Sequence, residues 1–406
     1  MNAREMMKIL EDNAYVRTGG TEEELRCANY IRDYLGKMGL EAVLEPFDVE
    51  MAKIQEAELT VDGISVPCTG YFCAGNWDVE GELYYLRHTD EISLENCRGK
   101  IVLLDTAVPY WKYQDLVAHG ALGYISCNGT IYSQNRDIDQ KEQRSFVHKG
   151  NRMPAVNIHA ADTIEIVRRK GKRAHIRLQQ EQWVGQSHNV VMDLPGEVEE
   201  YISFTAHYDS THLSIGPYDN MSGVVGLMYL AEKLAKEPRH FGLRFIFTGS
   251  EERGLLGAKA YCASEEKIKN CVMNINLDMI GCLMGRFISC VTAGERMCSY
   301  LTCLGNELGF QNDAYQGIYS SDSTPFADKN IPAVSFARLA PGTMAGYHDR
   351  YDDLSCMDGD QMEQDFEFVL AFARRMARAK HCPFPREMPE DIRKKLDNYL
   401  GIKRAQ

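Results

Sequence analysis

The sequence predicts an α/β fold: a three-layer sandwich of a mixed, mostly parallel sheet with helices on both faces, together with an inserted β-rich domain. From Asn189 onward, strand, loop and helix alternate, and the strands are apolar enough to be buried on both sides. Between about Met51 and Ser187, short β-like runs are instead separated by turns that contain Gly and Asn. With 406 residues the chain also exceeds the usual size of one hydrophobic core, so we expect two domains.

The N-terminal region predicts a helix followed by a strand. Thr21 and Glu24 have the spacing of a capping box, in which each side chain satisfies a free backbone N–H at the start of a helix. Apolar residues then recur at helical spacing, at Leu25, Ala28, Ile31 and Leu35. Gly39 is placed to end this helix, and residues 40–49 alternate between apolar and polar as a half-buried strand does.

The inserted region contains one recognisable βαβ unit. Residues 101–104 read as a strand, residues 111–119 as a helix and residues 122–126 as a second strand. Residues 130–150 are polar, so we expect an exposed loop there.

The remainder of the chain completes the main domain. We expect strands at 189–194, 201–206, 243–248 and 271–277, and helices at 223–236, 365–378 and 389–400. The simplest arrangement joins residues 1–50 and 188–382 into one domain. Residues 51–187 are then an insertion, and residues 383–406 form a C-terminal tail helix.

Composition excludes several classes of function. A formal net charge of −13 gives the chain no reason to bind nucleic acid, whose phosphates require clustered Lys and Arg. No stretch approaches the roughly 20 apolar residues that span a bilayer, and residues 1–20 lack the apolar core of a signal peptide. The 13 cysteines include no C-x-x-C pair and are expected to be reduced thiols. We therefore expect a cytoplasmic protein without nucleic-acid or membrane partners.

Histidines and carboxylates recur where predicted strands end. They occur in five segments: TAHYDS (205–210), GPYDNMSG (216–223), TGSEERG (248–254), NLDMIG (276–281) and GYHD (346–349). Each residue alone has an ordinary explanation; Asp219, for example, could be an N-cap. In open α/β sheets, however, ligands bind beyond the carboxyl ends of the strands, so these five loops can converge on one site.

The chemistry of these residues fits a pair of zinc ions. Zinc accepts imidazole nitrogen and carboxylate oxygen, and a paired site needs a bridging carboxylate plus one His and one carboxylate on each side. His207, His348 and three carboxylates of these segments supply that set, and one glutamate of the pair Glu251–Glu252 is left over. Peptide hydrolysis needs such a residue as a base. Cobalt or manganese would also be accepted.

In these segments the sequence resembles the family of co-catalytic zinc aminopeptidases that also includes glutamate carboxypeptidase and the transferrin receptor. The matching stretches are AHYDS (206–210), GPYDNMSG (216–223), GSEERGLLGA (249–258), NLDMIG (276–281), SDSTPF (321–326), IPAVSF (331–336) and YHDRYDDL (347–354). The resemblance implies that His207 and Asp278 hold one zinc and that Glu252 and His348 hold the other. It also implies that Asp219 bridges the two ions.

The resemblance implies three further roles. Glu251 would be the general base and acid, and the carboxylate of Asp209 would orient the imidazole of His207. The hydroxyl of Tyr347 would stabilise the tetrahedral intermediate.

Three positions depart from the family pattern without removing a ligand or the base. Ser323 stands where many relatives have His, so we expect an altered hydrogen bond on the substrate side. Met221 replaces a small residue and is expected to narrow the space beside the bridging Asp. Asp349 follows His348 where relatives commonly have a hydroxyl residue.

The inserted region resembles a protease-associated domain, which several relatives carry. The usual inferred role of that module is to shape access to the catalytic cleft, and a purely structural insertion is the alternative. The segments that carry this resemblance are GKIVLLDTA (99–107), GALGYI (120–125) and MPAVNIHAAD (153–162).

The expected function is therefore that of a di-zinc aminopeptidase acting on peptides. A carboxypeptidase or dipeptidase on the same site would need a cationic pocket, for which Arg338 and Arg350 are nearby candidates. A single-zinc glutaminyl cyclase-like transferase is disfavoured by the five ligands, and a non-catalytic binding protein is disfavoured more strongly. Side-chain preference and oligomeric state do not follow from the sequence.

Overall fold

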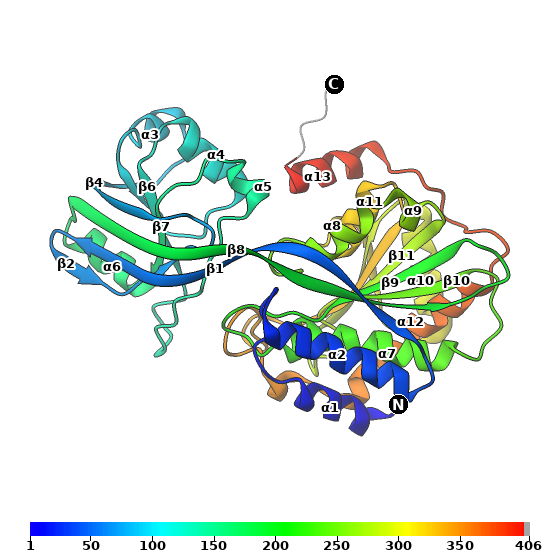
Figure 1. Ribbon diagram of the computed structural model, residues 1–406. Helices are drawn as coiled ribbons and strands as arrows, with labels where there is room; N and C mark the ends of the chain where they lie inside the picture. Colours follow the sequence, from blue (N-terminus) through cyan, green and yellow to red (C-terminus); the bar gives the residue numbers. More distant parts are fainter. Residues whose placement is uncertain (402–406) are drawn as a thin grey trace. The chain divides into compact units, whose positions relative to one another are not determined.

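The computed structural model describes residues 1–401 (Figure 1). The chain divides into two compact units. The first consists of Met1–Val49 and the residues from Gln186 onward, and the second consists of Glu50–Gly185. The second unit therefore interrupts the first in sequence.

The first unit is built on a mixed sheet with a parallel centre, which confirms the predicted fold class. Its strands, in spatial order, are β13 (Asp313–Gln316), β12 (Arg286–Thr292), β14 (Ala333–Leu339), β11 (Cys271–Leu277), β9 (Tyr201–His207), β10 (Gly242–Thr248) and the end of β8 (Arg173–Leu194). The strands β10, β9, β11 and β14 are parallel to one another, while β8 pairs antiparallel with β10 and β12 antiparallel with β14. The carboxyl ends of the four central strands consequently lie at one edge of the sheet.

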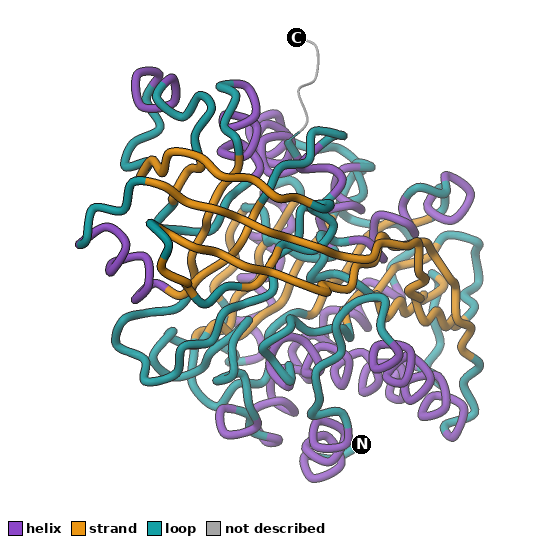
Figure 2. Tube along the Cα trace, turned by 60° about the vertical axis from the view of Figure 1, so that its left-hand side comes forward, coloured by secondary structure: helices purple, strands orange, loops and turns teal. Residues whose placement is uncertain are grey.

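Helices cover both faces of this sheet (Figures 1 and 2). One face carries α1 (Ala3–Asp12), α2 (Glu22–Lys37), α7 (Ser222–Leu234), α10 (Glu295–Leu308) and α12 (Gly359–Arg378), which share the largest apolar core. The other face carries α8 (Leu256–Cys262), α9 (Glu265–Ile268), α11 (Ser323–Asp328) and α13 (Glu390–Leu400). Helix α13 is tied to α11 because Arg393 donates to Ala327 O and to the carboxylate of Asp328.

The second unit contains more parallel sheet than one βαβ unit provides. Its strands are β4 (Trp77–Tyr85), β5 (Ile101–Leu103), β6 (Gly123–Asn128), β7 (Ala155–His159), β3 (Thr69–Gly70) and β2 (Ile64–Val66), with parts of β1 (Ala42–Val61) and β8. The strands β4, β5, β6 and β7 pair parallel with one another in that order, whereas β4 pairs antiparallel with β8 and β7 pairs antiparallel with β3. Its helices are α3 (Glu91–Glu95), α4 (Tyr110–Ala118), α5 (Ser145–His148) and α6 (Ala160–Arg168).

The chain passes between the units within strands. β1 has 20 residues and β8 has 22, and each belongs partly to both units. No helix among residues 1–401 is both long enough and apolar enough to cross a lipid bilayer.

Candidate metal centre and active site

The five predicted metal ligands lie together at the carboxyl edge of the first unit's sheet. His207 is the last residue of β9 and Asp278 directly follows β11, while Glu252 lies in the loop after β10. Asp219 comes from the turn before α7, and His348 comes from the loop after β14. The parallel register of β9 with β10 and β11 aligns the ends of these strands, so the loops that follow them meet.

The first half-site is buried. The Nε2 atom of His207 lies 3.2 Å from Asp219 Oδ1 and 3.6 Å from Asp278 Oδ1. The Oδ1 atom of Asp278 accepts no hydrogen bond from residues 1–401. A buried carboxylate oxygen without a donor is costly unless a cation satisfies it, so this oxygen fits a metal ligand.

The second half-site opens to solvent. The Nε2 atom of His348 lies 3.1 Å from Asp219 Oδ2 and 3.1 Å from Glu252 Oε2. The side chain of His348 is 48% exposed, whereas that of His207 is 1% exposed. His348 also has a φ of +60°, a left-handed conformation that non-glycine residues adopt uncommonly.

Asp219 joins the two half-sites. Its Oδ1 atom faces His207 and its Oδ2 atom faces His348, so each carboxylate oxygen belongs to a different group of ligands. Within each group the candidate ligand atoms lie within 4.8 Å of one another. Imidazole nitrogen and carboxylate oxygen in two groups with a shared carboxylate are a donor set that fits two zinc ions.

The carboxylates and histidines of the site shift one another's pKa values. Burial lowers the pKa of His207, but the negative charges of Glu251 and the surrounding carboxylates outweigh it and leave that pKa well above its usual range. Burial likewise opposes protonation of His348, yet Glu252 and Asp219 raise its pKa. Burial raises the pKa of Asp219, but hydrogen bonds from both histidines bring it below its usual range. In the metal-free chain, protons on the two imidazoles supply the charge that metal ions would bring.

Glu251 is buried beside the first half-site. Burial raises its pKa well above the usual range, and Glu252, Asp322 and Asp278 add to this effect while His207 opposes it. A carboxyl group that holds a proton easily can exchange it with a reacting group. Cations bound at the half-sites would lower this pKa again toward the range of a base, since positive charge favours the ionised form.

Asp209 contacts the loop that carries the two glutamates. Its Oδ1 atom accepts from the backbone N–H of Glu251 at 2.9 Å, and its Oδ2 atom accepts from that of Glu252 at 3.1 Å. The Nδ1 atom of His207 lies 3.4 Å from Asp209 Oδ1 and 3.3 Å from the Asp209 carbonyl oxygen. The role of this carboxylate in orienting His207 stays a prediction, and the structure adds that it holds the backbone of Glu251 and Glu252.

Tyr347 lies at the open half-site. Its side chain is exposed, and its ring centroid is 5.1 Å from that of His348 in an edge-on arrangement. The predicted stabilisation of the tetrahedral intermediate by its hydroxyl stays a prediction.

Of the expectations about departures from the family pattern, that for Met221 is wrong and that for Ser323 stays a prediction. Ser323 is buried, and its hydroxyl lies 2.8 Å from that of Ser335. Met221 is also buried, and its Sδ atom lies 4.0 Å from the Sγ atom of Cys27, in the core between α2 and α7. Asp349 accepts a hydrogen bond from the backbone N–H of Tyr351 at 2.8 Å.

Arg338 is paired within the protein. Its Nη2 atom lies 2.6 Å from Asp365 Oδ1, and its Nε atom donates to both oxygens of the same carboxylate. Its Nη1 atom donates to Gly285 O at 2.8 Å. All three nitrogens of the guanidinium are thus engaged, which leaves Arg338 poorly placed to bind a substrate carboxylate.

Two residues that the sequence did not single out hold the ligand loops. The Nδ2 atom of Asn220 donates to Leu277 O at 2.9 Å and its Oδ1 atom accepts from Met279 N at 3.2 Å, so its amide spans both neighbours of Asp278. Buried Asp352 accepts from the backbone N–H of Asp219. Both residues lie within the recognised segments, but the spacing of those segments does not reveal such contacts.

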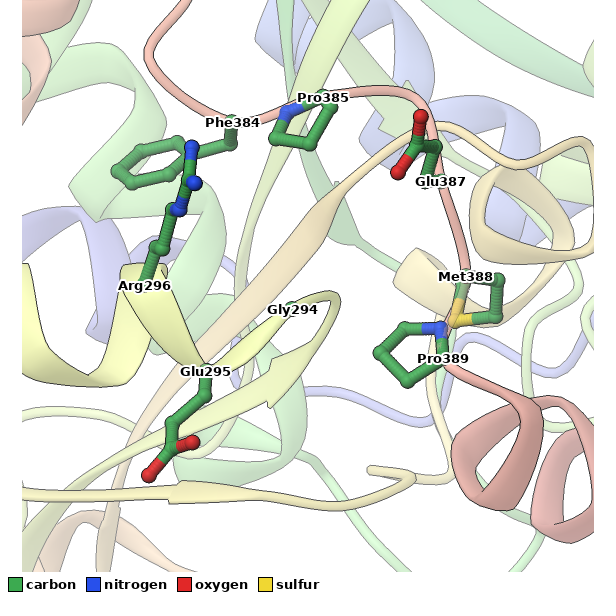
Figure 3. Close-up of a pocket in the computed structure, with 8 residues that line it drawn as sticks. All are labelled: Gly294, Glu295, Arg296, Phe384, Pro385, Glu387, Met388 and Pro389. Atoms are coloured by element: carbon green, nitrogen blue, oxygen red, sulfur yellow. The ribbon is translucent and has the colours of Figure 1, made fainter.

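A separate pocket is formed by the start of α10 and the segment that leads into α13 (Figure 3). It is lined by Gly294, Glu295, Arg296, Phe384, Pro385, Glu387, Met388 and Pro389. None of the five predicted ligands lines this pocket.

Comparison with known proteins identifies the same part of the chain. Residues 189–373 match the model of peptidase family M28. Aminopeptidase YwaD of Bacillus subtilis strain 168 is 26% identical over 291 residues, which cover 68% of this chain and 62% of that protein. The chain thus spans less than two thirds of the length of this relative.

Two solved structures share the fold over nearly the whole chain. The structure of BSAP, a zinc aminopeptidase from Bacillus subtilis, has a TM-score of 0.78 at 22% identity, covering 96% of this chain and 98% of that one. An aminopeptidase from Aneurinibacillus sp. strain AM-1 has a TM-score of 0.77 at 23% identity, covering 95% of this chain and 96% of that one. At such identities the likeness establishes the fold.

Proposed function

Because residues 189–373 belong to peptidase family M28, we propose that the chain is a di-zinc aminopeptidase that removes N-terminal residues from peptides. One observation carries this proposal: the two oxygens of Asp219 face two different histidines, His207 and His348. A shared carboxylate between two His-carboxylate groups supports a pair of metal ions rather than one. The three similar proteins described above are each named as an aminopeptidase, which supports the choice of reaction.

Each side chain has a defined part in the proposed reaction. His207 and Asp278 would hold one zinc ion, Glu252 and His348 would hold the other, and the carboxylate of Asp219 would be shared between the two groups of ligands. Two zinc ions at these positions would polarise the scissile carbonyl and lower the pKa of an attacking water.

Glu251 carries the proton in this proposal. It removes a proton from the attacking water and returns it to the departing amine. The hydroxyl of Tyr347, at the open half-site, donates a hydrogen bond to the oxygen that gains charge.

Specific contacts disfavour the alternatives. A carboxypeptidase or dipeptidase needs a free cation for the substrate carboxylate, and Arg338 is instead bound to Asp365. A glutaminyl cyclase-like transferase with one zinc needs only one group of ligands, whereas this chain has two, His207–Asp219–Asp278 and Asp219–Glu252–His348. A non-catalytic binding protein has no need of a buried glutamate beside a complete ligand set.

The proposal is tested with two adjacent variants, Glu251→Gln and Glu252→Gln. Metal content is measured by elemental analysis, and hydrolysis is measured on aminoacyl, N-acetylated and C-terminally blocked peptides. We expect about two zinc ions in the wild type. Cleavage should require a free N-terminus, tolerate a blocked C-terminus and stop with a chelator.

The two variants should separate the roles of the glutamates. Glu251→Gln should keep its zinc and lose about 10²–10⁴-fold in kcat, because only the proton carrier is removed. Glu252→Gln should lose zinc from one half-site. Near-normal turnover of Glu251→Gln, or cleavage that ignores the N-terminus, would contradict the proposal.

Two further proposals concern the whole protein. We propose that Glu50–Gly185 is a protease-associated domain that shapes substrate access, supported by its resemblance to that module in the segments around residues 99–107 and 120–125. We also propose a cytoplasmic location, supported by the free state of the cysteines, which suits a reducing compartment. Cell fractionation with an antibody to the chain tests the location.

A further inference from the structure

Glu24, in the first turn of α2, does not close the capping box that the sequence predicts. The Thr21 hydroxyl does accept from Glu24 N, at 3.3 Å. The carboxylate, however, passes Thr21: its Oε2 atom accepts from Gly20 N at 2.6 Å, and its Oε1 atom points away from the helix. Glu24 is buried, although the other acidic residues of this turn are exposed.

The Oε1 atom of Glu24 binds the loop that carries the proposed base. It accepts from the backbone N–H of Ser250 at 2.8 Å and from the Ser250 hydroxyl at 3.0 Å. The hydroxyl of Ser187 donates to the same oxygen at 2.9 Å. A buried carboxylate is tolerated when donors surround it, and here two of the four donors belong to the residue immediately before Glu251.

Ser250 has a backbone conformation that needs support. Its φ is +53°, in the left-handed region that non-glycine residues adopt uncommonly and at an energetic cost. Two hydrogen bonds that Ser250 donates to one carboxylate hold it in that conformation. The direction in which the chain leaves Ser250 sets the position of Glu251.

The segments around Glu24 and Ser250 fit against each other without spare room. A Cβ atom at Gly19 would lie 2.3 Å from the Ser250 hydroxyl oxygen, and one at Gly249 would lie 2.9 Å from Glu24 Oε1. The Nη1 atom of Arg253 donates to Gly19 O at 3.2 Å. Residues 19–24 therefore form a close-fitting support for residues 249–253.

We propose that Glu24 is a positioning residue for the general base: its carboxylate fixes Ser250 and so aims Glu251 at the attacking water. Asp209 holds the same loop from the other side, through the N–H groups of Glu251 and Glu252. Glu24 acts through the position of its carboxyl oxygen rather than through its charge, since Ser250 needs a hydrogen-bond acceptor at that position. The assignment of Glu251 as the base rests on the proposed function.

Two substitutions at Glu24 separate the effect of side-chain length from the effect of charge. Glu24→Asp keeps the charge but is one methylene shorter, so it cannot bind both Gly20 and Ser250. Glu24→Gln loses the charge and the acceptor for Gly20 N, but it can still present an oxygen to Ser250. Glu23, exposed in the same helical turn, receives the same two substitutions as a control.

Kinetics on the zinc-loaded protein give the first readout. Glu24→Asp should lower kcat by about 100-fold with little change in KM, because a displaced base affects the chemical step. Glu24→Gln should lose less than about tenfold by the same reasoning. Both Glu23 variants should match the wild type.

Amide hydrogen exchange of residues 249–253 gives a readout that does not depend on activity. Glu24→Asp should accelerate exchange there, in metal-free and zinc-loaded protein alike, while Glu24→Gln and the Glu23 variants should not. If Glu24→Asp does not fold, Ser250→Ala replaces it. Ser250→Ala removes only the hydroxyl donor and should change exchange and kcat in the same direction.

The results distinguish this proposal from the proposed function. Wild-type exchange in Glu24→Asp or in its substitute, or equal losses of kcat in Glu24→Asp and Glu24→Gln, would overturn the positioning role. Accelerated exchange confined to Glu24→Asp would support it even if the wild type hydrolysed no peptide. A wild type that hydrolyses no peptide would instead refute the aminopeptidase assignment.

Discussion

Replacing Asp352 with Asn should weaken metal binding while leaving the fold nearly as stable as before. Asp352 is buried, and its Oδ1 atom accepts from Tyr218 N at 3.0 Å. Its Oδ2 atom accepts from Asp219 N at 3.2 Å and from the Ser214 hydroxyl at 3.0 Å. Three donors on one carboxylate thus fix the turn that carries the bridging ligand.

The size of the effect depends on whether metal is bound. In the metal-free chain, burial and the charge of Asp219 raise the pKa of Asp352 to about 7, so at pH 6 most of this carboxyl is protonated and a neutral Asn resembles it. With both ions bound, the charge of Asp219 is neutralised and Asp352 ionises, so it accepts all three hydrogen bonds. An Asn amide has one acceptor oxygen and must leave at least one buried N–H facing its own N–H, at a cost of about 1–3 kcal/mol.

That cost destabilises the metal-bound state and therefore lowers the affinity for metal. A cost of about 1.4 kcal/mol corresponds to a tenfold loss of affinity. Zinc affinity at pH 7.5, measured by competition with a chelating dye, should therefore fall by about 10–100-fold. The free energy of unfolding of metal-free protein at pH 6, measured in urea, should change by less than about 1 kcal/mol. Asp353→Asn is the matched control, because Asp353 caps a short turn through Ser355 N and Asn caps equally well. Wild-type zinc affinity in Asp352→Asn would show that the carboxylate of Asp352 does not position Asp219 for metal binding.

The same contacts predict the order in which metal is lost, the cost of removing Arg338 and the pH dependence of zinc binding. Because the side chain of His348 is 48% exposed and that of His207 is 1% exposed, brief chelation should remove one zinc per chain first. Elemental analysis of His348→Ala should find the other zinc retained. Simultaneous loss of both ions would contradict this asymmetry. Arg338→Met leaves the buried carboxylate of Asp365 without its cationic partner, so the free energy of unfolding measured in urea should fall by about 3–5 kcal/mol. The preference between peptides with free and amidated C-termini should not change. A change in that preference would revive the carboxypeptidase alternative. The raised pKa values of His207 and His348 keep both imidazoles protonated in the metal-free chain, whereas zinc binds neutral imidazole, so zinc affinity should rise with pH. Calorimetry of zinc binding in buffers of different ionisation enthalpy should detect the release of protons. Binding without proton release would be inconsistent with histidine ligands.

Much of the fold and most of the candidate site follow from local patterns. The predicted strands at 201–206, 243–248 and 271–277 correspond to β9, β10 and β11, because runs of apolar residues between turns need no distant information. The ligand candidates stand out for a similar reason: each is a metal-binding residue type at the end of a strand, and the carboxyl ends of parallel strands meet. The boundary expected near residue 50 was harder to place, since β1 continues through it as one strand.

Residue type and position relative to the strand ends are enough to identify which side chains can do the chemistry, and both can be read from the sequence. Which atoms of these side chains meet depends on how the chain packs in three dimensions. Only packing could reveal that Met221 lies in the core, or that Asp219 offers one oxygen to each histidine. The spacing of Glu24 from Thr21 indicated a helix cap, yet its main partner, Ser250, is 226 residues away. Such a contact depends on how α2 packs beside the end of β10, and local sequence carries no record of that packing.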